Sequence, residues 1–126
     1  MFSEVWSTLF LFLTHLFALF EEVFTGQMFI LGYKYNSKNK IKCQLFNFIL
    51  GQAKMTIYLS RRKKLEESLD VDVICIFKRM LKARMKTDFT FFILSNNVED
   101  FEKMWSLKQV LCSVTIDKLV FGHILD

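Results

Sequence analysis

The residues best suited to chemistry in this sequence are cations, and the chemistry that they suggest is phosphate binding. Four are consecutive, Arg61-Arg62-Lys63-Lys64, and residues 33–64 hold nine lysines and arginines with no acid. Such a local excess attracts phosphate backbones or anionic lipid. The block would also suit the negative end of a helix dipole, and a solvated surface explains it equally simply. The sequence alone leaves these readings open.

A second basic row lies further along the chain. Lys78, Lys82 and Lys86 are spaced by four residues, Arg79 is beside them, and no acid occurs in residues 73–87. Residues four apart share a helix face, and like charges at that spacing destabilise an isolated helix by a few tenths of a kcal/mol. The row is therefore either a solvated face or a surface for an anion. The predicted nucleic-acid-binding residues are Lys54, Arg61, Arg62, Lys63, Lys64, Lys78, Arg79, Lys82, Arg84 and Lys86.

No pattern for catalysis or metal binding is visible in the sequence. Its cysteines and histidines are widely separated, whereas a structural zinc site uses four ligands in close-spaced pairs. The serines lack a G-x-S-x-G setting, and the four glycines form no phosphate-binding loop. Polymerase chemistry needs clustered carboxylates for two metal ions, but the paired acids here resemble helix starts. We expect no enzyme activity, no metal and no cofactor.

The compartment is predicted from the cysteines and the N-terminus. An odd number of cysteines without a convincing secretion signal suggests reduced thiols in the cytosol or nucleus, packed as small hydrophobes. Residues 5–20 lack charge but are shorter than the roughly twenty residues of a spanning helix. On a helical wheel five polar residues fall in a narrow stripe, which also holds Leu11 and Ala18; the five are Glu4, Ser7, Thr14, Glu21 and Glu22. A core helix is predicted, with membrane insertion as the alternative.

The apolar pattern predicts a mainly α protein, with three to four helices in a small bundle. Helices are expected from Ile41 to Glu67 and from Val71 or Asp72 to Leu94, with Asp70 or Asp72 as N-cap. A short helix, VEDFEKMWSL, follows Asn96 or Asn97, and VLCSVTIDKLVFGHI could form a hairpin around Asp117-Lys118. The chain is thus one domain or a fragment: residues 1–24 an apolar helix, 25–42 a loop, and 43–126 a helical module.

Two details of these elements are also predicted. Gly51 in the first long helix suggests close packing or a local bend, since glycine costs a helix about 1 kcal/mol. The segment QMFILG, within the predicted loop, is either a buried strand or the end of a helix.

The order of several segments resembles the C-terminal region of a LINE-type, non-LTR retrotransposon polyprotein. The segments are MFILGYKY, LFNFILGQAKMTIYLSRRKK, DVICIFKRMLKARMKTDFTFF and FEKMWSLKQVLCSV, within residues 21–121. The most specific parts are residues 51–54 with Arg61-Arg62, residues 82–84, and Trp105 followed by Leu111-Cys112. The Tyr-x-Asp-Asp turn, the endonuclease residues and the Cys/His cluster of such polyproteins are absent from the sequence.

The resemblance implies a non-catalytic accessory fragment. In that family the basic C-terminal region follows an endonuclease and a reverse transcriptase and is thought to help hold RNA. A missing parent polyprotein would also explain the apolar N-terminus. We therefore expect contacts with nucleic-acid phosphates, with RNA as the expected ligand, and without base specificity. The alternatives are a small membrane-associated protein anchored by residues 5–20, or a translated relic without selected function.

Overall fold

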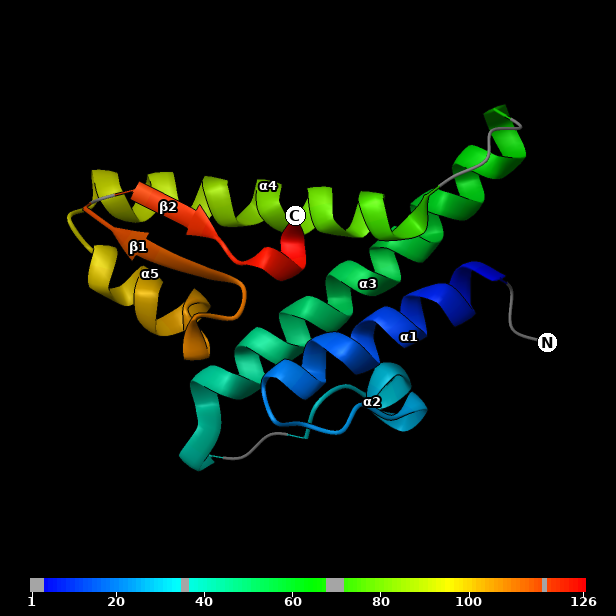
Figure 1. Ribbon diagram of the computed structural model, residues 1–126, viewed down its shortest axis with the longest axis horizontal. Coiled ribbons are helices and arrows are strands. Elements are labelled where there is room, and N and C mark those ends of the chain that lie inside the picture. Colours follow the sequence, from blue (N-terminus) through cyan, green and yellow to red (C-terminus); the bar gives the residue numbers. More distant parts are fainter. Residues whose placement is uncertain (1–3, 35–36, 68–71, 117) are drawn as a thin grey trace.

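Two long helices, α3 (Lys40–Glu67) and α4 (Val73–Leu94), organise the fold of the computed structural model. The structure describes residues 4–34, 37–67, 72–116 and 118–126. Figure 1 shows α1 beside α3 and running in the opposite direction, while α4 crosses α3 and lies next to the C-terminal hairpin. The remaining elements are α1 (Glu4–Leu19), α2 (Gly26–Leu31), η1 (Ser37–Asn39), α5 (Val98–Trp105), η2 (Leu107–Gln109), β1 (Cys112–Thr115), β2 (Lys118–Phe121) and η3 (His123–Leu125).

The mainly α class and the C-terminal hairpin are confirmed, but two predictions about the N-terminal third are wrong. Five α-helices occur in the described residues instead of three to four. The extra helix is α2, within the predicted loop 25–42, where the 3-10 helix η1 also lies. The Thr25 hydroxyl caps α2 by accepting a hydrogen bond from the Met28 N–H at 3.2 Å. The first five residues of QMFILG therefore belong to a separate short helix, and Gly32 is its C-cap.

Helix α1 is a core helix, as predicted. Its inner face is fully buried, and aromatic contacts join it to both long helices: the Phe17 ring lies 4.9 Å from that of Phe46, and the Phe12 ring 5.8 Å from that of Phe77. Of the predicted stripe, Ser7, Leu11, Thr14 and Ala18 are exposed. The helix ends at Leu19 instead of residue 24, so Glu21 and Glu22 lie beyond it. The apolar side chains that membrane insertion would place in lipid are thus buried in the protein, at Leu9, Leu13, Leu16, Phe17 and Phe20. Within the described residues, no helix has the length and apolar character needed to cross a bilayer.

Helix α4 begins and packs as the sequence indicates. The Asp72 carboxylate accepts hydrogen bonds from the Ile74 and Cys75 N–H groups, both at 3.1 Å, which makes Asp72 the N-cap. Three or four residues apart along the helix, apolar side chains turn toward the core, with Phe77, Leu81 and Met85 fully buried. At the next helix the capping prediction is only half right: Asn97 occupies the N-cap position of α5, but its side chain makes no capping hydrogen bond.

Helix α3 has nearly its predicted bounds, but its apolar residues do not match its buried face at every position. Ile41 and Met55 are 44% and 50% exposed, while Thr56 and Ser60 are buried instead. Gly51 is exposed, and a Cβ built on it would meet nothing within 4 Å. The prediction that Gly51 marks close packing is therefore wrong, and no bend is needed to accommodate a neighbour there.

The hairpin closes the C-terminal half of the core. Strands β1 and β2 are antiparallel, with Cys112 opposite Phe121 and Thr115 opposite Lys118. This register places the turn one residue earlier than expected, and Ile116 adopts a φ of 50°, which is unusual for a β-branched residue. Two of the three cysteines are buried, Cys43 and Cys112; Cys75 is exposed, so the prediction of a packed side chain is wrong for it.

Burial of Cys112 makes stability sensitive to alkaline pH. Desolvation, and secondarily the nearby Glu102 carboxylate, raises the pKa of the Cys112 thiol from 9.0 to about 12. Above pH 9 the unfolded chain therefore loses a proton that the folded protein keeps, so stability falls as pH rises. Between about pH 8 and about pH 10.5, we expect the free energy of unfolding to fall by about 2 kcal/mol more in the wild type than in Cys112→Ala.

Urea unfolding under reducing conditions at both pH values measures this difference. Other alkaline groups act in both proteins and cancel in the comparison. Equal losses in the wild type and in Cys112→Ala would contradict the assignment.

Candidate nucleic-acid interface

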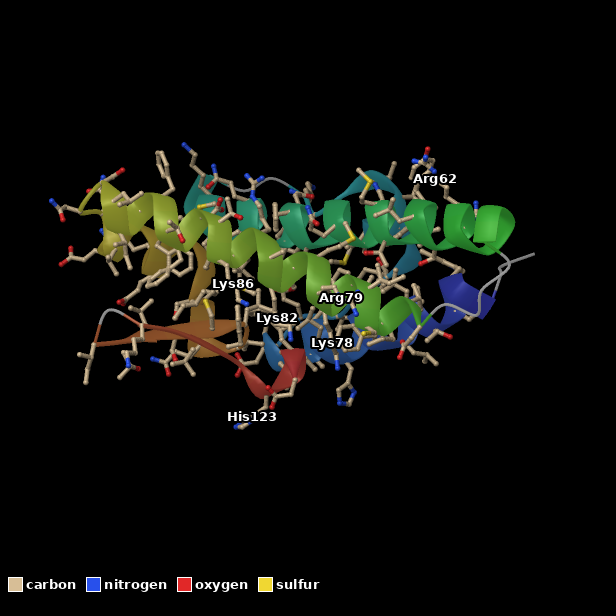
Figure 2. The ribbon with its side chains drawn as sticks, turned by 90° about the horizontal axis from the view of Figure 1, so that it is seen from above. Arg62, Lys78, Arg79, Lys82, Lys86 and His123 are labelled. Carbon is tan, nitrogen blue, oxygen red and sulfur yellow. The ribbon has the colours of Figure 1, made fainter. Side chains whose placement is uncertain are left out.

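The basic row on α4 forms a continuous surface feature. Lys78, Lys82 and Lys86 follow one another along a single face, and Arg79 lies beside them. Lys78 and Lys82 are half-buried, whereas Arg79 and Lys86 are exposed. Figure 2 shows the three lysines between α4 and the C-terminal hairpin and 3-10 helix. The predicted row therefore exists, but it borders the hairpin instead of standing free in solvent.

The lysines of the row contact the aromatic and carbonyl groups around them. The Lys78 ammonium donates a hydrogen bond to the Asp126 carbonyl oxygen at 2.9 Å and lies 5.4 Å from the Phe12 ring centroid. Both Lys82 and Lys86 place their ammonium groups over the Phe121 ring, at 5.9 and 5.7 Å. A cation over an aromatic face gains about 0.5–1 kcal/mol at exposed sites. These contacts hold the lysine stems in place, and an ammonium has three donors, so each group can also bind an anion.

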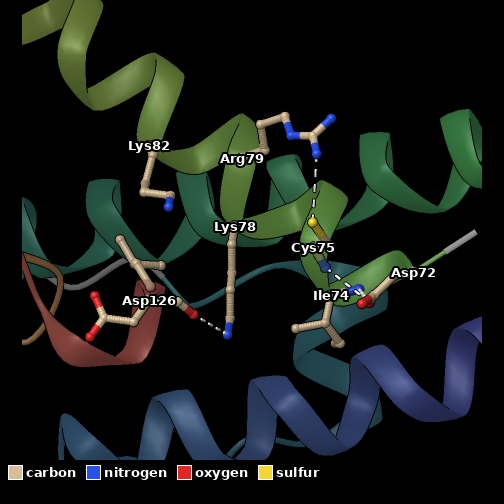
Figure 3. Close-up of a pocket in the computed structure, with 8 residues that line it drawn as sticks. Asp72, Ile74, Cys75, Lys78, Arg79, Lys82 and Asp126 are labelled. Atoms are coloured by element: carbon tan, nitrogen blue, oxygen red, sulfur yellow. Dashed lines mark hydrogen bonds between the residues drawn. The ribbon is translucent and has the colours of Figure 1, made fainter.

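A pocket of about 430 Å³ opens beside the first half of this row. Figure 3 shows Asp72 at the start of α4, Asp126 at the end of the C-terminal 3-10 helix facing Lys78, and Arg79 pointing away from Lys78. The two carboxylates already have partners: that of Asp72 caps α4, and that of Asp126 lies 3.1 Å from the His123 ring. The lining residues are Asp72, Ile74, Cys75, Lys78, Arg79, Lys82, Leu125 and Asp126.

Sequence reasoning missed several residues of this pocket. Cys75 is exposed there, and its sulfur accepts a hydrogen bond from the Arg79 guanidinium at 3.7 Å. A helical wheel could have found it, because Cys75 lies three residues before Lys78 and four before Arg79. Leu125 and Asp126 carried no such signal, since only the fold brings the end of the chain to α4.

Arg84 does not belong to the row. It lies on another face of α4, where its Nε is 3.3 Å from the Asp88 carboxylate and its guanidinium is 5.7 Å from the Phe48 ring. The other Asp88 oxygen accepts a hydrogen bond from the Trp105 indole at 3.2 Å. Arg84 is thus part of the contact between α3, α4 and α5.

The remaining predicted cations lie on α3, in two further places. Arg61 and Arg62 are exposed near its C-terminal end, and Figure 2 shows Arg62 on the far side of α3 from the α4 row. Lys63 and Lys64 continue the same helix, but their side chains fall outside the described residues. Lys54 approaches the Ile30 carbonyl oxygen at 3.5 Å and the Phe29 ring at 5.7 Å. The ten predicted residues therefore do not form a single surface.

The excess of cations in residues 33–64 is partly compensated from outside that segment. The Glu22 carboxylate pairs with the Lys42 ammonium and accepts a hydrogen bond from the Tyr33 hydroxyl at 3.3 Å. The hydrogen bond to Glu22 is the main cause that raises the pKa of Lys42, while burial is the main cause that raises the pKa of Tyr33. Lys42 therefore joins the N-terminal segment to α3 and contributes less to any external field.

The fold and surface define a small helical module with a basic row along one helix. No family model matches the chain, and no solved structure matches it. The chain is similar to the transposon TX1 uncharacterized 149 kDa protein of Xenopus laevis, with 28% identity over 102 residues. That alignment covers 81% of this chain but 8% of the Xenopus protein. The similarity supports a transposon-derived origin.

Proposed function

We propose that this chain is a non-catalytic accessory module, derived from the C-terminal region of a retrotransposon reverse transcriptase polyprotein, that binds the nucleic-acid backbone. One observation carries the proposal: four cations, Lys78, Arg79, Lys82 and Lys86, lie along one face of α4 beside a pocket. The similarity to a transposon protein gives such a surface a context in which nucleic acid is present. Arg61 and Arg62 provide a second, separate place for phosphate contact.

The proposed contact is electrostatic and independent of sequence. Lysine and arginine contacts with phosphates fix the position of a strand but carry no direct information about its bases. The lysines of the row are held against Phe121 and Asp126, so less side-chain entropy is lost on binding. The proposed role is non-catalytic because the sequence lacks a Tyr-x-Asp-Asp turn and clustered carboxylates for metal-ion chemistry.

Binding to single-stranded RNA is expected to weaken steeply with salt. Four phosphate contacts predict a slope of about −2.8 in a plot of log affinity against log salt. Affinity should therefore fall roughly 50-fold between about 50 and 200 mM salt. Fluorescence anisotropy with a labelled oligonucleotide measures this slope, and the same titration with DNA tests for a preference between the two.

A pair of matched variants locates the contact. Replacing both Arg79 and Lys86 by glutamine should make the slope shallower by about 1.4, at 0.7 per lost contact. Replacing Lys40 and Lys103 by glutamine removes the same charge outside the row and should change the slope little. Affinity that is insensitive to salt, or equal slopes in the two double variants, would exclude the row as the binding surface. Arg61→Gln with Arg62→Gln tests the α3 contact in the same way.

A further inference from the structure

We propose that the pocket between α4 and the C-terminal 3-10 helix is a discrete site for one phosphate group. This inference rests on the proposed function, because a nucleic-acid strand is one source of that phosphate and free phosphate is the other. Three cations, Lys78, Arg79 and Lys82, line the pocket within five residues of one helix. The attraction of the basic row for phosphate would otherwise be spread along the helix, and the pocket provides one defined binding position.

The donors around the pocket are only partly used. One Lys78 hydrogen bond goes to the Asp126 carbonyl, which leaves two further N–H donors on its ammonium. The Arg79 guanidinium contacts a cysteine sulfur, which is a weak acceptor, and arginine offers five donors in a fork that suits phosphate. Figure 3 shows Lys78 and Lys82 pointing toward the C-terminal 3-10 helix, while the Arg79 guanidinium points the other way and lies over Cys75.

The charge of the pocket also favours an anion. The side chains that line it are three cations and two carboxylates, so one positive charge is in excess among these side chains. Both carboxylates are engaged, Asp72 with the backbone of α4 and Asp126 with His123. Leu125, which is fully buried, and Ile74 supply apolar walls, and a wall of low dielectric strengthens the attraction between charges.

The size of the pocket suits a phosphate with an attached group. The volume of the pocket, about 430 Å³, is many times the space that one water molecule needs. That is more than a bare ion fills, and it leaves room for a hydrated phosphate with its sugar. Both sources of the phosphate therefore fit and must be separated by experiment.

Cys75 provides a probe at the site. Of the three cysteines, Cys75 alone is exposed, and Cys43 and Cys112 are buried. Its rate of reaction with an anionic aromatic disulfide reports the local positive charge. Dividing by the rate with a neutral disulfide cancels changes in the reactivity of the thiol itself. We expect Arg79→Gln to lower this ratio roughly threefold, whereas Arg61→Gln with Arg62→Gln leaves it unchanged.

Competition then identifies the ligand, at an ionic strength kept constant with chloride. If inorganic phosphate slows the reaction of Cys75, and that slowing is absent from the double variant Arg79→Gln with Lys82→Gln, the result supports the site with free phosphate as its ligand. Protection by a short oligonucleotide alone, lost in the same variant, supports it with a backbone phosphate as ligand. If neither inorganic phosphate nor the oligonucleotide slows the reaction of Cys75, while RNA binding still weakens with salt as expected, the pocket is not the phosphate site. The proposed function then stands. If RNA binding is also absent, the proposed function fails with it.

Discussion

Gly122→Ala is expected to lower the free energy of unfolding by about 3 kcal/mol. A Cβ at this position would overlap the Val110 carbonyl oxygen and lie 3.0 Å from its carbon and 3.3 Å from the Leu111 oxygen. These are backbone atoms, so they cannot move aside as a flexible side chain would. The φ of −68° at Gly122 is accessible to any residue, which means that the cost comes from the overlap alone.

The same substitution should disturb the basic row. The Gly122 N–H donates a hydrogen bond to the Leu111 carbonyl at 2.8 Å, which holds the end of β2 against the chain before β1. Phe121, immediately before it, carries the contacts with the Lys82 and Lys86 ammonium groups. Displacing this strand would therefore loosen the lysines as well as the hairpin.

Gly51→Ala is the matched control, with an effect of opposite sign. Gly51 lies in the middle of α3 with open space around its Cα, so alanine adds no contact and removes backbone freedom from the unfolded chain. A gain of about 1 kcal/mol is expected. Urea unfolding of both variants tests the pair. A loss of less than about 1 kcal/mol in Gly122→Ala would show that the hairpin can relax around the methyl group.

Local signals in the sequence were sufficient to predict the two long helices. The bounds of α3 and α4 follow from apolar periodicity, and the start of α4 from the Asp72 carboxylate that caps it. The hairpin follows from a run of β-branched residues. Helix α2 was not predicted because its six residues are too few to show the apolar period of a helix. Thr25, which precedes it, is nevertheless a good capping residue. Each of these features depends on residues close together in the chain.

The surroundings of the cations could not be predicted, because they depend on distant segments. Phe121 lies beneath Lys82 and Lys86 only after the hairpin has folded back onto α4. The Asp126 carbonyl reaches Lys78 for the same reason. Arg84 is different: it was predicted together with the row, but two residues after Lys82 it points to another side of the helix, and a helical wheel could have separated it. The charge pattern thus identified the row, while tertiary structure created the pocket.

Trp105→Ala is expected to lower the free energy of unfolding by about 4 kcal/mol. Trp105 is 1% exposed, and its ring lies 4.8 Å from that of Phe48 and 6.4 Å from that of Phe101. Alanine would leave a large cavity where α3, α4 and α5 meet. It would also leave the Asp88 carboxylate, which is largely buried, without its indole donor.

Trp105→Phe separates the two contributions. Phenylalanine keeps an aromatic ring in the cavity but loses the hydrogen bond to Asp88, so we expect a loss of about 1–2 kcal/mol. Combining Trp105→Phe with Asp88→Asn in a double-mutant cycle isolates the energy of that contact. Additive losses would mean that Asp88 and Trp105 are not coupled. A coupled pair would instead show that Asp88 links α4 to α5 through Trp105 while it also holds Arg84.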